Sequence, residues 1–206
     1  MNLKKLKPVN YTINFKLKSL PVLIFILLSF MGASCVVNDS KNNTNHLQDP
    51  QQTGHVSERF AHYHQGQFII PGDSQSIETF VALTMKQQEQ GLSFVKPNEM
   101  DPFQGLLFVY AQDQNLMFWM PDTFFNLDLI YLSKDLVVVD IHHNLEFFPS
   151  REPFEKIPRA KQVYARHVLE IRSDSPLAQK IKYGMKLEWK ASKDLEQILS
   201  SIRPQQ

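Results

Sequence analysis

Hydrophobic and polar side chains follow strand-like patterns over most of the chain after residue 65. They alternate over residues 77–83 and 162–171, and uninterrupted apolar runs cover residues 105–110 and 116–120. Alternation with a period of two is typical of a strand with one buried face, whereas a short apolar run favours a strand buried on both faces. Each of these four segments therefore predicts a β-strand.

Turn residues separate further short elements. Residues 127–132 and 136–141 flank a Ser-Lys-Asp turn at 133–135, which predicts a β-hairpin. Two more short apolar segments, 67–70 and 185–190, predict additional strands.

Three segments predict short helices. Residues 86–90 end at Gly91, and Ser175 followed by Pro176 begins a second helix that Gly184 closes. In the C-terminal segment 192–206, apolar residues recur at helical spacing and predict an amphipathic helix: Leu195, Ile198, Leu199 and Ile202. Many short strands with two or three short helices predict a mainly β fold, a small closed or sandwich-like β domain over residues 66–191.

The first 35 residues follow the pattern of an export signal. A basic stretch ends at Lys18, an apolar run extends from Leu20 to Met31, and small residues precede Cys35. The apolar core of about 14 residues is short for a helix that spans a bilayer of about 30 Å. We therefore expect residues 1–35 to be a signal peptide, with an uncleaved anchor as an alternative.

The end of this signal, Met31-Gly32-Ala33-Ser34-Cys35, resembles the lipobox of bacterial lipoproteins. The Ala-Ser-Cys ending matches, whereas Gly32 stands where a leucine-like residue is usual. The resemblance implies that Cys35 is lipidated and tethers the protein to a membrane of the cell envelope, on the periplasmic face or the cell surface. An ordinary cleaved secretory signal is the other alternative.

Composition narrows the classes of partner. Residues 36–65 are mostly polar, which predicts a disordered tether. Without the five lysines that precede Cys35, the chain carries 17 basic and 21 acidic residues. A mildly acidic body gives no electrostatic reason to expect nucleic-acid binding. The single cysteine cannot form an internal disulfide or a thiolate zinc site, and we expect no cofactor and no metal.

Several sequence blocks resemble the family of domain of unknown function 192 over residues 74–190. They occur in the expected order: Gln90-Gly91-Leu92, Gly105-Leu106-Leu107-Phe108-Val109-Tyr110, Phe118-Trp119-Met120-Pro121-Asp122-Thr123, Leu127-Asp128-Leu129-Ile130 and Ala165-Arg166-His167-Val168-Leu169-Glu170. The resemblance implies a compact β-rich fold, often behind an export signal, with no established activity or cofactor. The chain departs from the family pattern at five positions: Gln88, Ser93, Asp122, Asn126 and Met185.

Asp128 is the most informative polar residue, because it interrupts an apolar strand. A carboxylate there needs hydrogen-bond donors or a cation, since an unpaired buried charge costs several kcal/mol. Thr123 and Arg166 are candidate partners by residue type. A structural role, in which Asp128 caps the turn at residues 121–123, is the alternative.

Two readings of the aromatic and acidic residues follow. In the first, the chain is a tethered accessory module that binds a small molecule or an envelope protein through these residues: Trp119, Asp122, Thr123, Asp128, Arg166 and Glu170. In the second, Asp122, Asp128 and Glu170 form the carboxylate cluster of a hydrolase-like enzyme. A structural envelope protein without a site is the third possibility.

Overall fold

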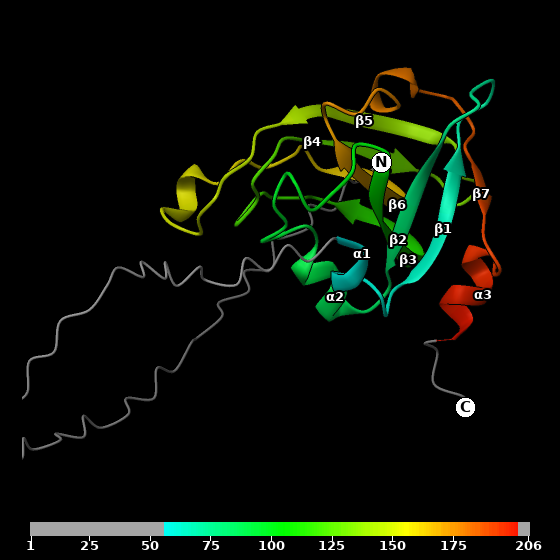
Figure 1. The fold of residues 1–206 in the computed structure, drawn as a ribbon, viewed down its shortest axis with the longest axis horizontal. Coiled ribbons are helices and arrows are strands. Elements are labelled where there is room, and N and C mark those ends of the chain that lie inside the picture. Colours follow the sequence, from blue (N-terminus) through cyan, green and yellow to red (C-terminus); the bar gives the residue numbers. More distant parts are fainter. Residues whose placement is uncertain (1–55, 202–206) are drawn as a thin grey trace, which may run out of the picture. The chain divides into compact units, whose positions relative to one another are not determined.

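The computed structural model describes residues 56–201, and the predicted signal, Cys35 and most of the predicted tether lie outside them. The described part contains one seven-stranded sheet with the strand order β5-β4-β6-β3-β2-β1-β7 (Figure 1). The strands are β1 (His64–Ile69), β2 (Ser76–Ala82), β3 (Gln104–Leu116), β4 (Leu127–Leu132), β5 (Val138–Leu145), β6 (Val163–Arg172) and β7 (Glu188–Lys190).

Neighbouring strands are antiparallel except for β2 and β3, which are parallel. A parallel pair needs a crossover connection, and residues 83–103 provide it. The helices are α1 (Val56–Arg59), α2 (Met85–Gln90) and α3 (Leu195–Ser200), with 3-10 turns η1 (Phe154–Lys156) and η2 (Ala178–Lys180). The predicted mainly β fold with short helices is therefore confirmed.

The sheet has a hydrophobic core on each face. The aromatic face carries these rings among its buried residues: Phe60, Tyr63, Phe80, Phe108 and Tyr131. The aliphatic face is built mainly from branched side chains, including Ile70, Ile77, Val81, Ile130, Leu169 and Ile171. Residues of α1 pack on the aromatic face and residues of α3 on the aliphatic face. Because β4 lies between both cores, all six of its residues are buried.

The sheet is open, so the closed form of the predicted domain is wrong. Its edge strands are β5 and β7, and β7 has only three residues. The chain comes closest to closure where the start of β5 meets the segment before β7. There Val138 N donates to Met185 O at 2.8 Å, and Val137 forms an isolated bridge with Lys186. One bridge is too little for a continuous ladder.

Three predicted boundaries need correction. Residues 116–120 are not a separate strand, because β3 continues to Leu116 through a register shift between Val109 and Gln114. The segment 175–184 contains only the turn η2 instead of a full helix. The predicted tether ends too late, because Val56, Phe60 and Tyr63 are buried in the aromatic core.

The helical predictions near the crossover and the C-terminus are confirmed. α2 ends at Gly91 and begins with a capping box in which Thr84 and Gln87 bond reciprocally. α3 has the same arrangement between Asp194 and Gln197, and its Leu195, Ile198 and Leu199 are buried. Ile202 lies outside the described residues. Within residues 56–201, no helix is both long enough and apolar enough to cross a bilayer.

Candidate functional site

Strand β6 places Glu170 at the base of a small cavity. Alternation along β6 puts Val168 on the aromatic face, and Glu170, two residues further on, projects from the same face. The cavity has a volume of about 50 Å³ and lies between α2 with its following loop, the loop 118–123 and the sheet. Its lining includes Gln88, Gly91, Ser93, Phe108, Trp119, Thr123 and Glu170.

Burial controls the chemistry of Glu170. The residue is only 5% exposed, and its Oε2 atom has no hydrogen-bond partner among the described residues. Burial raises the pKa of this carboxyl to about 8, because a charged carboxylate loses its hydration there. Glu170 is therefore mostly protonated at neutral pH, and its proton is available to a hydrogen-bond acceptor.

Two tyrosines respond to the same environment. Burial, and then the charge of Glu170, raises the pKa of Tyr110 to about 12. Burial is also the main cause of the raised pKa of Tyr131, whose hydroxyl is buried without a partner among the described residues. Both phenols therefore stay neutral at physiological pH.

Gly91 is required by the geometry of the cavity wall. Its φ is +49°, a conformation that side chains rarely adopt. A Cβ at this position would lie 3.4 Å from Phe108 Cζ and 3.9 Å from Glu170 Oε2. The glycine both ends α2 and leaves space above the carboxyl group.

The loops that flank the cavity contain strained backbone. Phe94 and Asp122 have φ values of 66° and 55°, and Phe94 N donates to Asp122 O at 2.8 Å. Residues other than glycine rarely adopt this conformation, and such residues cluster at functional sites. Phe94 and Asp122 are two of the four such residues in the described part of the chain; the other two, Leu136 and Asn144, lie in the turn before β5 and in β5.

One aromatic residue of the cavity lining is exposed. Trp119 is 43% exposed and packs edge-to-face on Phe154, with 5.6 Å between ring centroids. The guanidinium of Arg159 lies 4.6 Å from the centroid of Phe154. The indole of Trp119 therefore offers an exposed apolar surface beside the cavity.

Thr123 and Asp122 hold the cavity wall in place. Thr123 Oγ1 donates to Met120 O at 2.8 Å and accepts from Phe148 N at 3.0 Å. Asp122 forms an ion pair with Arg151. Thr123 lines the cavity, but its hydroxyl is already used within the protein.

Asp128 has a different environment from the one predicted. It is fully buried, and its partners are on β5: His143 Nδ1 lies 2.6 Å from Oδ2, and Asn144 N donates to Oδ1 at 2.8 Å. Its expected pairing with Thr123 or Arg166 is wrong. The β4–β5 ladder shifts register between Leu127 and Leu129, so the carboxylate satisfies groups that the bulge displaces.

Arg166 lies elsewhere as well. Its Nε donates to Asp113 Oδ1 at 2.6 Å and its Nη1 donates to Ala111 O at 2.8 Å. Both acceptors belong to β3, at its register shift. Of the six predicted site residues, Trp119, Thr123 and Glu170 line one cavity, Asp122 flanks it, and Asp128 and Arg166 support other parts of the sheet.

The remaining cavity residues carried a weaker signal in the sequence. Gln88 Nε2 donates to Val109 O at 3.0 Å, and Ser93 Oγ donates to Pro121 O at 2.9 Å. Both are positions where the chain departs from the family pattern, as is Asp122. In the sequence, only this departure from the family pattern singles out Gln88 and Ser93.

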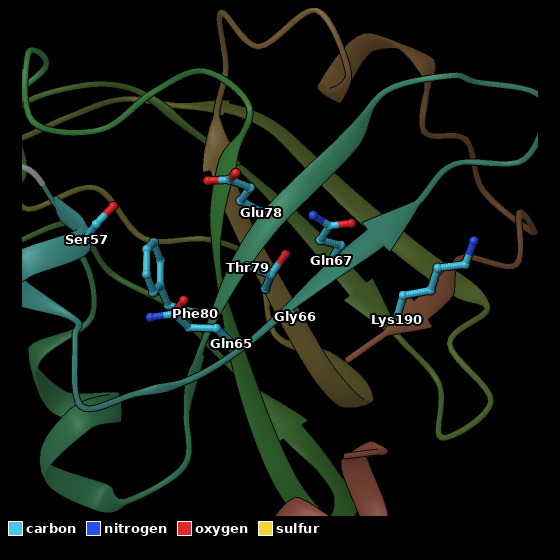
Figure 2. A pocket seen from close by; sticks show the side chains of 8 residues that line it. All are labelled: Ser57, Gln65, Gly66, Gln67, Glu78, Thr79, Phe80 and Lys190. Atoms are coloured by element: carbon cyan, nitrogen blue, oxygen red, sulfur yellow. The ribbon is translucent and has the colours of Figure 1, made fainter. Parts of the chain in front are cut away.

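A second hollow lies on the sheet itself. It has a volume of about 340 Å³, and Figure 2 shows Gln65 and Gln67 of β1, Glu78 of β2 and Lys190 of β7 around it. Glu78 Oε2 accepts from Gln104 Nε2 at 3.3 Å. None of the described side chains around this hollow has a buried polar atom without a partner, so it presents less specific chemistry than the Glu170 cavity.

The fold and the cavity define a small, mainly β domain with a buried acid beneath an aromatic rim. The chain belongs to the family DUF192, described as "Uncharacterized ACR", whose model matches residues 68–189. The predicted family membership is thereby confirmed, with slightly wider bounds.

Two solved structures are similar to this chain. One, from Sinorhizobium meliloti 1021, is described as a proposed transcription regulator; it is 26% identical, with 62% of this chain and 95% of that chain covered and a TM-score of 0.49. The other, a protein of unknown function from Novosphingobium aromaticivorans, is 25% identical, with 61% and 84% covered and a TM-score of 0.49. No curated protein matches the chain.

Proposed function

We propose that this protein is an exported, membrane-tethered module that binds a small molecule in the Glu170 cavity. The observation that carries the proposal is the buried carboxyl group of Glu170, whose Oε2 has no partner among the described residues and whose pKa burial raises to about 8. A buried polar atom without a partner costs about 1–3 kcal/mol. A ligand that supplies the missing hydrogen bond recovers this energy.

The size of the cavity limits which part of the ligand enters it. A volume of about 50 Å³ has room for a small polar group, whereas whole ligands occupy about 300–1,000 Å³. We therefore expect a carbonyl or hydroxyl oxygen to enter and accept the proton of Glu170. The rest of the ligand would pack on Trp119 at the rim, where an exposed indole offers a broad apolar surface.

Binding has more support than hydrolysis. A hydrolase that uses Asp122, Asp128 and Glu170 needs carboxylates that are free to act on one substrate. Asp128 uses both oxygens on β5, and Asp122 is paired with Arg151. Of these three carboxyl groups, only that of Glu170 has a buried oxygen without a partner among the described residues.

The two tryptophans of the chain allow a direct test of binding. In a Trp189→Phe variant, Trp119 is the only remaining tryptophan and reports on the rim of the cavity. We expect carbonyl-bearing fragments such as N-methylacetamide derivatives of aromatic rings to change its fluorescence saturably. Hydrocarbon isosteres without the carbonyl should bind at least about ten-fold more weakly, since one hydrogen bond to a buried group contributes about 1–3 kcal/mol.

Glu170→Leu is the matched binding variant. It replaces the carboxyl group, which is the proton donor, by an apolar side chain of similar size. It should abolish the preference for the carbonyl fragments while the protein stays folded. Asp140→Asn, on strand β5, is the control and should leave the preference unchanged. Equal binding of both fragment series to the Glu170→Leu variant and to the parent would reject the site.

The tether is a separate part of the proposal. Its support is the order of basic, apolar and small residues before Cys35. In bacterial cells, Cys35→Ser should move the protein from the membrane fraction to the soluble fraction and remove incorporation of labelled palmitate. Membrane retention of the serine variant would contradict lipidation without affecting the binding proposal.

A further inference from the structure

A further hollow lies on the opposite face of the sheet from Glu170. It is a groove of about 590 Å³ between α3, the hairpin turn at 134–136 and the segment 186–189. Figure 1 places α3 beside the end of the sheet. Six of the thirteen lining residues are apolar: Pro71, Leu136, Leu187, Trp189, Leu195 and Leu199. The volume is typical of small-molecule sites, which combine apolar side chains with placed polar groups.

His167 is a buried polar residue in the lining of this groove. Alternation along β6 directs it to the aliphatic face, away from Glu170. It is 3% exposed, it lines the groove, and its Nδ1 atom has no partner among the described residues. Burial lowers the pKa of His167 to about 4, so the imidazole is neutral at physiological pH and brings no positive charge into the groove.

The charged residues of the groove are mostly acidic. Four carboxylates line it, from Asp135, Glu188, Asp194 and Glu196, against two ammonium groups, from Lys134 and Lys186. Lys134 Nζ lies 3.7 Å from Glu196 Oε1, an ion pair that uses one acid and one base and leaves the acidic excess of the lining unchanged. Complementary charge favours a cation at this rim and disfavours an anion.

We propose that this groove binds a small apolar molecule that carries one positive charge. The apolar part would lie against Leu187, Trp189 and Leu199. The cationic group would remain at the rim near Asp135 and Glu196, where it keeps part of its hydration. The proposal concerns a site separate from the Glu170 cavity and does not depend on it.

Fluorescence of Trp189 tests the proposal in the full chain. In a Trp119→Phe variant, Trp189 is the only tryptophan, and its ring lines the groove. The probes are dodecylamine and dodecanoate, which share a chain length and differ in charge, at pH 7 and below their micellar concentrations. We expect saturable binding of the amine at least ten-fold tighter than that of the carboxylate.

Charge reversal at the rim provides the decisive variant. Asp135→Lys combined with Glu196→Lys changes two exposed residues, so the fold should remain intact. It should invert the preference, with dodecanoate binding tighter than dodecylamine. The control, Glu58→Lys combined with Glu146→Lys, makes the same change in net charge away from the groove and should keep the original preference.

Three results would overturn the inference. They are the absence of a saturable Trp189 signal with either probe, equal affinity for both probes, and an unchanged preference in the rim variant. Glu170→Gln in the same background should leave amine binding unchanged, so failure at the Glu170 cavity and failure at this groove are distinguishable.

Discussion

The two faces of the sheet bury different kinds of side chain. The aliphatic face buries mainly branched side chains such as Ile130, Leu169 and Ile171, together with the neutral imidazole of His167. The aromatic face buries Glu170 and the hydroxyl of Tyr131 among rings, and each has a polar atom without a partner in the described part of the chain. Since adjacent residues of β4 and β6 project to opposite faces, the same strands support both arrangements.

This difference affects both the stability of the fold and the chemistry of the buried groups. Branched aliphatic side chains contribute stability in proportion to the apolar area they bury. A buried carboxyl without a partner reduces stability and is retained only where something else favours it. Both cores contribute stability through the apolar area they bury, and the aromatic face in addition contains the buried acid of the Glu170 cavity.

The largest effect should come from the titration of Glu170. Its pKa is about 8 in the folded protein against a usual value of 4.5, so between these values the folded state holds a proton that the unfolded state has released. The free energy of unfolding should therefore fall as pH rises from 5 to 8, by about 1.4 kcal/mol per pH unit or roughly 4 kcal/mol in total. Urea unfolding of the parent and of Glu170→Gln at both pH values measures the difference.

The glutamine variant should lose this slope, because it cannot ionise. Glu146→Gln, at an exposed position, serves as the control and should keep the slope of the parent. Parallel pH profiles for the parent and Glu170→Gln would mean that the carboxyl is hydrated in the folded state.

The opposite face should show a large effect without pH dependence. Leu169→Ala removes a fully buried side chain from the aliphatic core, and such changes lower the free energy of unfolding by about 2–5 kcal/mol. The loss should be equal at pH 5 and pH 8. Tyr164→Ala, on the same strand at an exposed position, should have little effect. A loss that varies with pH would indicate that the two cores are coupled.

Much of the fold was predictable because local patterns agree with it. The alternation in residues 162–171 predicts β6 within one residue, and the hairpin of β4 and β5 follows from its turn. The continuity of β3 was not predictable, because polar residues at 111–115 follow the apolar run and the strand persists through pairing with β6. The crossover between β2 and β3 depends on long-range pairing that no local pattern contains.

The candidate site was predictable only in part. Trp119 was predicted as an aromatic residue of a ligand pocket, and Glu170 as a member of an acidic cluster beside it. Asp128 was predicted because it interrupts an apolar strand, yet its partners come from the β5 bulge around His143 and Asn144. A sequence pattern can predict that a carboxylate is buried, whereas the pairing register of the strands determines which residues are its partners. The same limit applies to Arg166.

A smaller effect is expected at Asp128. Asp128→Asn keeps an acceptor for Asn144 N and loses the charged oxygen beside His143, which should lower the free energy of unfolding by about 2 kcal/mol. Because Asp128 lies outside the Glu170 cavity, the folded variant should retain the carbonyl-fragment preference. Chemical denaturation and the Trp119 fluorescence assay measure the two properties separately. Loss of binding at full stability would restore Asp128 to the site.

The smallest effect on stability should come from Thr123→Val. In contrast to Asp128→Asn, this variant should lose fragment affinity and little stability. The change removes the two hydrogen bonds that join Thr123 Oγ1 to Met120 and Phe148, at a cost of about 1 kcal/mol to folding. These bonds position the loop that carries Trp119, so fragment affinity at the rim should fall several-fold although Thr123 donates nothing to the ligand. The ratio of binding loss to stability loss should therefore be higher for Thr123→Val than for Asp128→Asn. The reverse ratio would mean that β4 and β5 position the site, and not the loop that crosses the aromatic face.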